Sequence, residues 1–115
     1  MEPTSLFKAL SDPTRLRCLL LLSRKTELCV CELTQVLDLP QPKVSHHLAA
    51  LRKTGLVSDR KEGLWIHYRI SPDLPDWAGR VIQATADGIA DQEPFAGDGN
   101  KLFATNQRVA ELCAS

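Results

Sequence analysis

The sequence predicts a mainly α-helical domain that carries one β-hairpin, an α+β fold. Apolar side chains recur at helical spacing in several segments of residues 5–54. Residues 56–70 are instead rich in β-branched and aromatic side chains on both sides of a turn at residues 61–63, which is typical of a hairpin. The 115 residues, 43% of them hydrophobic, suffice for one domain with one modest core.

The first half of the chain is expected to form four helices, over residues 5–10, 11–23, 26–37 and 41–54. Residues 11–13, Ser-Asp-Pro, form a helix start with a capping side chain and a proline in the first turn. The two prolines of residues 39–42 break the chain, because proline disfavours helix in the residue before it. Gly55 lies just past the fourth helix, where a left-handed residue commonly ends a helix.

The second half is expected to hold the hairpin, one more helix and a tail. The strands are predicted over residues 56–60 and 64–70, and the helix from residue 74 or 76 to residue 90. Residues 93–100 are predicted to be a linker because of their Pro, Gly, Asp and Asn content. We therefore assign residues 1–92 to one domain and residues 93–115 to a linker and a C-terminal tail with weak helical spacing.

The formal net charge of +0 conceals an asymmetry along the chain. Residues 1–70 contain 11 of the 14 basic and 7 of the 14 acidic side chains, a net charge of +4, whereas residues 71–115 have a net charge of −4. A basic half indicates a polyanionic partner. Uneven decoration of the surface explains the charges equally well when they are considered alone.

Two classes of protein are excluded by the apolar pattern. The longest apolar run, residues 18–22, is far shorter than the roughly 20 residues that span a bilayer. The N-terminus has no basic stretch followed by an apolar one, so we expect no signal peptide and a cytoplasmic protein with no membrane contact. The cysteines are then expected to be reduced thiols, with metal binding or redox chemistry as their roles, at Cys18, Cys29, Cys31 and Cys113.

The order of helix, short break, helix and hairpin is that of a winged helix-turn-helix. In that fold the second helix, here residues 41–54, enters the major groove, and the hairpin reaches the flanking backbone or the minor groove. Side chains on the outward face of this helix and basic side chains near it are expected to contact DNA, namely Gln41, Lys43, Ser45, His46, Arg52, Arg60 and Lys61. The alternative for this face is a solvated helix surface. His47 faces inward and is expected to be a hydrogen-bonded histidine of the core or its rim.

Several stretches carry a resemblance to a known family, namely Phe7–Arg17 (FKALSDPTRLR), Glu27–Leu33 (ELCVCEL), Gln41–Leu48 (QPKVSHHL), Leu51–Val57 (LRKTGLV) and the wing Arg60–Trp65 with Tyr68-Arg69. In this order they resemble the ArsR/SmtB metalloregulatory repressors, over about residues 5–90. The resemblance implies a homodimer that joins through its first and last helices and binds double-stranded operator DNA of an arsenic-resistance operon. It also implies that residues 1–92 form the DNA-binding and dimerisation domain, and that the protein is not an enzyme.

The residues around Cys29 and Cys31 resemble the inducer site of the arsenic-sensing ArsR branch. The resemblance implies an inducer, As(III) or Sb(III), that binds both thiols and releases the DNA, and no permanently bound cofactor. Trivalent arsenic is a soft acid that prefers thiolates. If both cysteines lie in one helix, two residues apart, their side chains point about 200° apart. For both to bind one arsenic, the start of the helix would have to unwind or bend, and this would displace the recognition helix. The helix dipole is expected to favour thiolates here, with Glu27 and Glu32 opposing it.

Many arsenic-sensing relatives carry a third cysteine where this chain has Thr34. The third donor therefore stays open between Cys18, Cys113, a solvent hydroxide and a small thiol. For Cys18 the favoured alternative is a core residue. For the pair at residues 29 and 31, the alternative is two buried apolar cysteines without a ligand.

Three other functions are compatible with parts of the sequence. A zinc or cadmium sensor would place His and carboxylate pairs on the last helix, but residues 74–92 contain no His. A thiol oxidoreductase or arsenate reductase would use Cys-x-x-Cys beside a βαβ unit, and the sequence has neither. A DNA-binding module without an inducer would leave the two thiols without a role.

Overall fold

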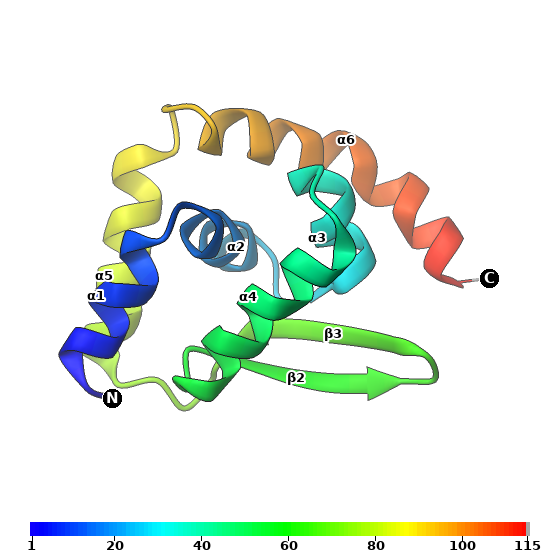
Figure 1. Cartoon of the computed structure of the whole chain (residues 1–115). Coiled ribbons are helices and arrows are strands. Elements are labelled where there is room, and N and C mark those ends of the chain that lie inside the picture. The colour runs from blue at the N-terminus through cyan, green and yellow to red at the C-terminus, as the bar shows by residue number, and fades with distance from the viewer. Residues whose placement is uncertain (115) are drawn as a thin grey trace.

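The computed structural model describes the backbone of residues 1–114 and the side chains of residues 1–104. Its elements follow in the order α1 (Pro3–Ser11), α2 (Pro13–Arg24), β1 (Leu28–Cys29), α3 (Val30–Leu37), α4 (Gln41–Lys53), β2 (Val57–Glu62), β3 (Trp65–Ile70), α5 (Asp76–Ile89) and α6 (Phe95–Ala114). Helices surround α2, and the hairpin of β2 and β3 projects from them (Figure 1). This is the predicted mainly helical fold with a β-hairpin wing.

The hydrophobic core is built around α2, which packs against α1, α4, α5 and α6. Its leucines 19–22 are buried, and they meet buried leucines of the other elements, including Leu33, Leu48 and Leu51. Four consecutive apolar residues cover more than one helix face, because successive residues lie about 100° apart. A helix buried on several sides can therefore hold the bundle together, and the elements that could reach DNA lie outside it.

The start of α2 agrees with the prediction from the Ser-Asp-Pro pattern. The Asp12 side chain accepts a hydrogen bond from the Arg15 N–H at 3.0 Å, and this backbone donor lowers the pKa of the Asp12 carboxyl. The Arg15 side chain in turn donates to Nδ1 of His47 at 3.2 Å. His47 is therefore a half-buried, hydrogen-bonded histidine between α2 and α4, as its inward position predicts.

The sheet has three antiparallel strands in the order β1-β3-β2. The hairpin pairs Val57 with Ile70 at its base and Glu62 with Trp65 at its tip, and Gly63 adopts a positive φ of 62° in the turn. The strand β1 was not predicted, because its residues were assigned to a helix starting at Thr26. The prediction is wrong for residues 28 and 29, since pairing with the edge of β3 holds them extended and buried.

A second correction concerns residues 93–100, which composition predicted to be a linker. The helix α6 begins at Phe95 and packs on α3 and α2. The carboxylate of Asp98 is buried and accepts two hydrogen bonds from the Arg17 side chain, each 2.8 Å long. Leu102, one turn later, is buried too. Tertiary contacts of these two residues therefore outweigh the helix-breaking tendency of Gly97 and Gly99.

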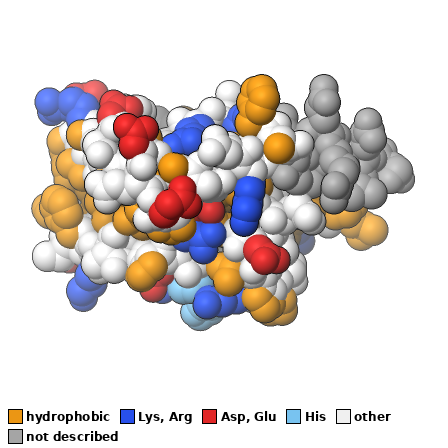
Figure 2. Space-filling model, turned by 90° about the horizontal axis from the view of Figure 1, so that it is seen from above, with side chains coloured by type: hydrophobic (Ala, Val, Ile, Leu, Met, Phe, Trp, Pro, Cys, Tyr) orange, Lys and Arg blue, Asp and Glu red, His pale blue; other side chains and the backbone are white. Residues whose placement is uncertain are grey.

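The middle and the edges of the surface differ in a view onto α6 (Figure 2). Acidic and basic side chains are interspersed over the middle of this face, whereas hydrophobic side chains appear at the end of the molecule where α1 and α5 lie and also along other edges of the face. Phe7 of α1 is 55% exposed.

Within the described part of the chain, we find no helix that combines the length and the apolar character needed to cross a membrane.

Candidate functional site

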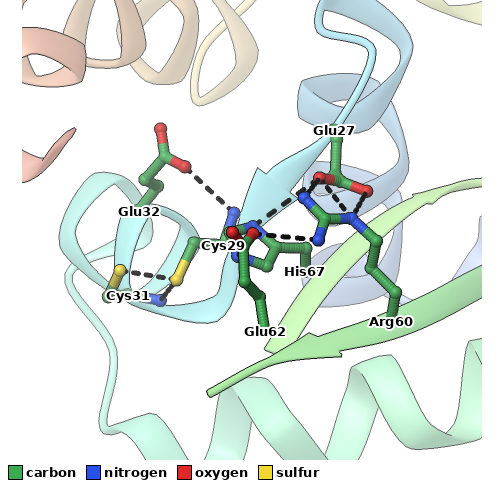
Figure 3. A network of polar contacts seen from close by, with 7 residues as sticks. All are labelled: Glu27, Cys29, Cys31, Glu32, Arg60, Glu62 and His67. Carbon is green, nitrogen blue, oxygen red and sulfur yellow. Dashed lines mark hydrogen bonds and ion pairs between the residues drawn. The ribbon is translucent and has the colours of Figure 1, made fainter. Parts of the chain in front are cut away.

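The two cysteines of the Cys-x-Cys pair lie with their sulfurs 2.7 Å apart (Figure 3). Cys29 is the last residue of β1 and the N-cap of α3, with φ −72° and ψ 149°, whereas Cys31 lies in the first turn of the helix. The expectation that the two side chains point about 200° apart is wrong, because it treated both residues as helical. The extended conformation of Cys29 turns its side chain toward Cys31 without any unwinding of the helix.

The Cys29 sulfur takes the place that a Ser or Thr hydroxyl normally has at a helix start. It accepts a hydrogen bond from the Cys31 N–H at 3.4 Å, and the Cys29 N–H donates to Oε1 of Glu32 at 3.0 Å. The Glu32 N–H also donates to the Cys29 sulfur, so Cys29 and Glu32 are joined by two reciprocal bonds that form a capping box. The box satisfies N–H groups that a helix start would otherwise leave without a partner. The thiol pair is therefore part of the structure that begins α3.

Burial raises the pKa of the Cys29 thiol. The N–H donors of Cys31 and Glu32 lower this pKa by a smaller amount, and the negative charge of Glu32 raises it. The expectation that the helix start favours a thiolate is therefore wrong for Cys29: desolvation, which penalises the charged form, outweighs the helix N-terminus.

The structure does not bring Cys18 to this pair. Cys18 is fully buried in α2, and burial raises the pKa of its thiol to about 12. Cys113 lies outside the residues whose side chains are described. Among side chains 1–104, no three His, Cys, Asp or Glu residues form a group that could hold a metal ion. The hydroxyl of Thr34, at the position of the missing third cysteine, is buried and has no hydrogen-bond partner among the described residues.

A cavity of about 450 Å³ adjoins the thiol pair. Its walls come from the start of α3, one face of α4 and the wing, and are formed by Cys29, Val30, Cys31, Gln41, Ser45, Ala49, Leu64, Trp65, Ile66 and Tyr68. This cavity was not predicted from the sequence. One signal was available, since Gln41, Ser45 and Ala49 follow each other at intervals of four and so share a helix face.

The predicted DNA-contacting residues of α4 lie at its exposed start. Gln41, Lys43 and His46 are exposed, and Ser45 is half-buried. The Gln41 amide donates to the Ser45 hydroxyl at 2.6 Å. Gln41 and Ser45 therefore face both the cavity beside the thiols and the surface expected to meet DNA.

The wing residue Arg60 lies in a network of ion pairs with Glu62 of its own strand and with Glu27, the residue just before β1 (Figure 3). Its guanidinium is 2.6 Å from Glu27 and 2.9 Å from Glu62, and its hydrogen bonds to Glu27 lower the pKa of that carboxyl. The His67 ring lies between the same two carboxylates, 3.7 Å and 3.8 Å away. The charge predicted for phosphate contact is therefore already balanced in the absence of DNA.

The other two basic candidates differ from Arg60 and from each other. Arg52, at the end of α4, pairs with Asp59 of β2 at 2.9 Å and is half exposed. Lys61, near the wing tip, is exposed. A wing that carries both ion-paired and exposed basic side chains is suited to contact with the DNA phosphates more than to recognition of bases.

Comparison with known proteins places this geometry in a family. Residues 12–59 match the family model described as bacterial regulatory protein, arsR family. The chain is 44% identical over 108 residues to the arsenic resistance transcriptional regulator ArsR1 of Pseudomonas putida, covering 94% of this chain and 83% of that protein. It is 58% identical over 80 residues to the arsenical resistance operon repressor of Escherichia coli, covering 70% of this chain and 68% of that protein.

Solved structures support the same assignment. The antimony-specific transcriptional repressor AntR aligns with a TM-score of 0.64 and 32% identity, over 76% of this chain and 77% of its own. The transcriptional repressor BigR from Xylella fastidiosa aligns with a TM-score of 0.66 and 32% identity, over 78% of this chain and 85% of its own. The predicted resemblance and winged-helix fold are thereby confirmed. The chain belongs to the arsR family of bacterial regulatory proteins, as a DNA-binding transcriptional repressor of the arsenical-resistance type and not an enzyme.

Proposed function

We propose that this repressor binds operator DNA as a dimer and releases it when Cys29 and Cys31 bind trivalent arsenic or antimony. The observation that carries the proposal is the 2.7 Å separation of the two sulfurs at the start of α3. Soft trivalent metalloids select thiolate ligands, and two adjacent sulfurs can bind one centre without a large rearrangement. The names of the relatives, arsenic resistance regulators and an antimony-specific repressor, point to the same class of inducer.

The cavity offers a short route from the thiols to the DNA-binding surface. Gln41 and Ser45 of α4 line it together with Cys29 and Cys31. A ligand at the sulfurs therefore changes the surroundings of the side chains that we expect to read bases. An inducer lowers DNA affinity only if it binds the DNA-free conformation more tightly, and competition for the orientation of Gln41 and Ser45 supplies such a difference.

The dimer interface is proposed on the α1 and α5 side. Hydrophobic side chains lie at that end of the molecule (Figure 2), where Phe7 is half exposed. Trp77 and Val81 of α5 are partly buried against the core and add apolar surface there. An exposed apolar patch on a small protein commonly marks a contact with another chain. A two-fold dimer places two α4 helices for two half-sites of an operator.

Release of operator DNA by arsenite, antimonite, zinc and cadmium tests the inducer assignment. We expect release by the two metalloids and not by zinc or cadmium. The double variant Cys29→Ser/Cys31→Ser should bind the operator and no longer respond, because Ser keeps the N-cap acceptor of α3 and removes both soft ligands. Fluorescence anisotropy of labelled operator DNA measures both properties.

Cys18→Ala is the matched control for this experiment, because it removes a thiol that is buried away from the pair. It should keep its response to arsenite. A normal response in the double variant would contradict the assignment of the thiol pair, and a loss of response in a folded Cys18→Ala variant would point to Cys18 as a donor.

A further inference from the structure

We infer that Leu64, at the tip of the wing, inserts between base pairs in the minor groove of the operator and kinks the DNA there. This inference rests on operator binding by the repressor, and it involves neither the thiol pair nor the inducer. It gives the wing a role beyond phosphate contact, because the cost of a kink depends on the base step that is deformed. Leu64 thereby becomes a residue that determines sequence preference.

Leu64 is 97% exposed, the highest value among the large hydrophobic side chains of the described residues. The hairpin does not depend on it, since Val57 and Tyr68 are the side chains that bury the wing against the core. A single exposed leucine needs no explanation by itself. Its position on the wing and the charges beside it are what indicate a partner.

The tip of the wing is narrow and stands in open space. Gly63, with a φ of 62°, and Leu64 form a two-residue turn between β2 and β3 at the end of the projecting hairpin (Figure 1). Gly63 brings no side chain, and a Cβ placed there would meet no atom within 4 Å. The Leu64 side chain can therefore approach another molecule without interference from the rest of the protein.

The minor groove of DNA admits such a tip but not the whole hairpin. The groove is about 6 Å wide and about 7.5 Å deep. The backbones of two paired strands are already about 4.8 Å apart, so a ribbon with its side chains is too wide to enter. A single side chain at the turn fits, and leucine is one of the apolar residues that minor-groove proteins insert between base steps.

The tip also lies on the side of the molecule that is expected to meet DNA. Leu64 lines the cavity between α4 and the wing together with Gln41 and Ser45, which lie at the exposed start of α4. With α4 in the major groove, a wing beside its start meets the neighbouring backbone and minor groove. The insertion is therefore continuous with the DNA contact of α4.

The charges beside Leu64 favour a polyanion over a protein partner. Lys61 is exposed and the Arg60 side chain is half exposed, so both can approach phosphates that border the groove. Glu62, the acidic residue near the tip, is paired with Arg60 at 2.9 Å. Leu64 and Trp65 alone offer far less area than the roughly 800 Å² per partner of a stable protein interface.

The test uses DNA duplexes that the parent protein selects from a random pool, so that no operator sequence has to be assumed. Energy transfer between dyes at the two duplex ends measures the bend, and 2-aminopurine at the steps that flank the contacted bases brightens when a base unstacks. We expect the parent protein to bend the DNA by at least about 20° and to unstack a flanking step. Leu64→Ser should lose both signals, whereas Leu64→Met should keep them because methionine is also an apolar wedge.

Base-step preference gives a second readout of the insertion. Pyrimidine–purine steps such as TA are easily unstacked, whereas A-tracts are stiff. The parent protein should therefore bind a duplex with TA at the flanking step about fivefold or more tightly than one with an A-tract there. Leu64→Ser should bind the two duplexes about equally.

Two further variants separate insertion from other effects. Phe103→Ser is the matched control, because Phe103 of α6 is also a strongly exposed apolar side chain, at 89%, and lies outside the wing. It should keep the bend and the step preference. Leu64→Lys adds a charge at the tip, so it should steepen the salt slope of binding by about one without restoring the kink.

The outcomes separate this inference from the proposed function. A bend and a step preference that are the same in the parent protein and in Leu64→Ser would overturn the insertion and leave operator binding intact. Losses in Phe103→Ser as large as those in Leu64→Ser would also overturn it, because the effect would not come from the wing tip. If the parent protein selects no DNA at all, the proposed function falls together with this inference.

Discussion

The two ends of α3 are built in different ways. Its N-terminal end begins at the thiol pair and borders a cavity of about 450 Å³. Its C-terminal end lies under α6, where the buried Arg17–Asp98 ion pair joins α2 to α6 and Arg17 also donates to the carbonyl oxygen of Leu37 at 3.4 Å. The helix therefore has one anchored end and one end with space around it. A ligand at the open end can shift the start of the helix without unpacking the core.

Electrostatics differ between these ends as well. The ion pair at the anchored end is buried, with Asp98 only 5% exposed, so removal of one partner leaves a charge in a low dielectric. The Glu27–Arg60 pair near the open end is half exposed, and water screens such pairs strongly. We therefore expect substitutions at the anchored end to change stability, and substitutions at the open end to change binding.

The largest expected effect is at the anchored end. Asp98→Ala should destabilise the protein by about 3–5 kcal/mol, because it leaves the Arg17 guanidinium buried without its carboxylate. Denaturant unfolding measures this change. Asp76→Ala is the control, since it breaks the exposed Arg80–Asp76 pair and should cost less than about 1 kcal/mol. Equal costs in the two variants would show that α6 does not anchor α3.

At the open end, Gln41→Ala and Ser45→Ala should weaken operator binding by roughly 1–3 kcal/mol each if the side chains contact base edges. The salt dependence of binding should stay unchanged, because neither residue neutralises a phosphate. Anisotropy titrations at several salt concentrations measure both quantities. A weakened salt dependence would instead show that these residues contact the DNA phosphates. An unchanged affinity would show that they do not contact the DNA.

Thr34 lies between the two ends and tests both of them. Thr34→Val should raise stability by about 1 kcal/mol, because it removes a buried hydroxyl that has no hydrogen-bond partner among the described residues. Thr34→Cys should tighten the binding of arsenite more than that of methylarsenite. In arsenite a third sulfur can replace the third oxygen on arsenic, whereas in methylarsenite a carbon occupies that position. X-ray absorption counts the sulfurs on arsenic in both proteins. Equal tightening of the two arsenicals would show that residue 34 does not reach the metalloid.

A smaller effect is expected from the wing network. Glu27→Gln should free the Arg60 charge for phosphate and increase the magnitude of the salt slope of DNA binding by about one. Glu62→Gln, which removes the more exposed partner of Arg60, should change the slope less. An unchanged salt slope in Glu27→Gln would mean that Arg60 does not contact the DNA. The salt slope of Lys61→Ala would then show whether another cation of the wing contacts it.

The smallest effect is a pH dependence at His47, on the side of α4 that contacts α2. Burial lowers the pKa of His47, and the charges of Arg15 and Lys43 lower it further while Asp12 raises it. The unfolded chain therefore binds a proton more readily than the folded one, so stability should fall as pH decreases through about 6.5. His47→Gln should lose this part of the dependence in unfolding experiments between pH 7.5 and 5.5. An equal fall of stability with pH in the parent protein and in His47→Gln would show that other groups cause the pH dependence.

Much of the fold could be predicted because its signals are local. The capping Asp12, the prolines at the start of α4 and the change to strand-forming residues at the wing each act within a few positions of the chain. The helix α4 was predicted within one residue of its observed bounds. The Cys-x-Cys pair was also visible in the sequence. Its geometry was not, because the sequence alone does not show that Cys29 pairs with β3 and stays extended.

The sequence by itself determined the order of helices α1 to α5 and of the hairpin, the family and the two thiols, since capping, periodicity and motif spacing depend on neighbours along the chain. Only the tertiary structure decided where α3 begins, that α6 starts at Phe95, and that the thiols share a cavity with Gln41, Ser45 and Trp65. These features depend on residues that are far apart in the sequence, such as Arg17 with Asp98, and their contact energies exceed the local preferences of the segments they hold.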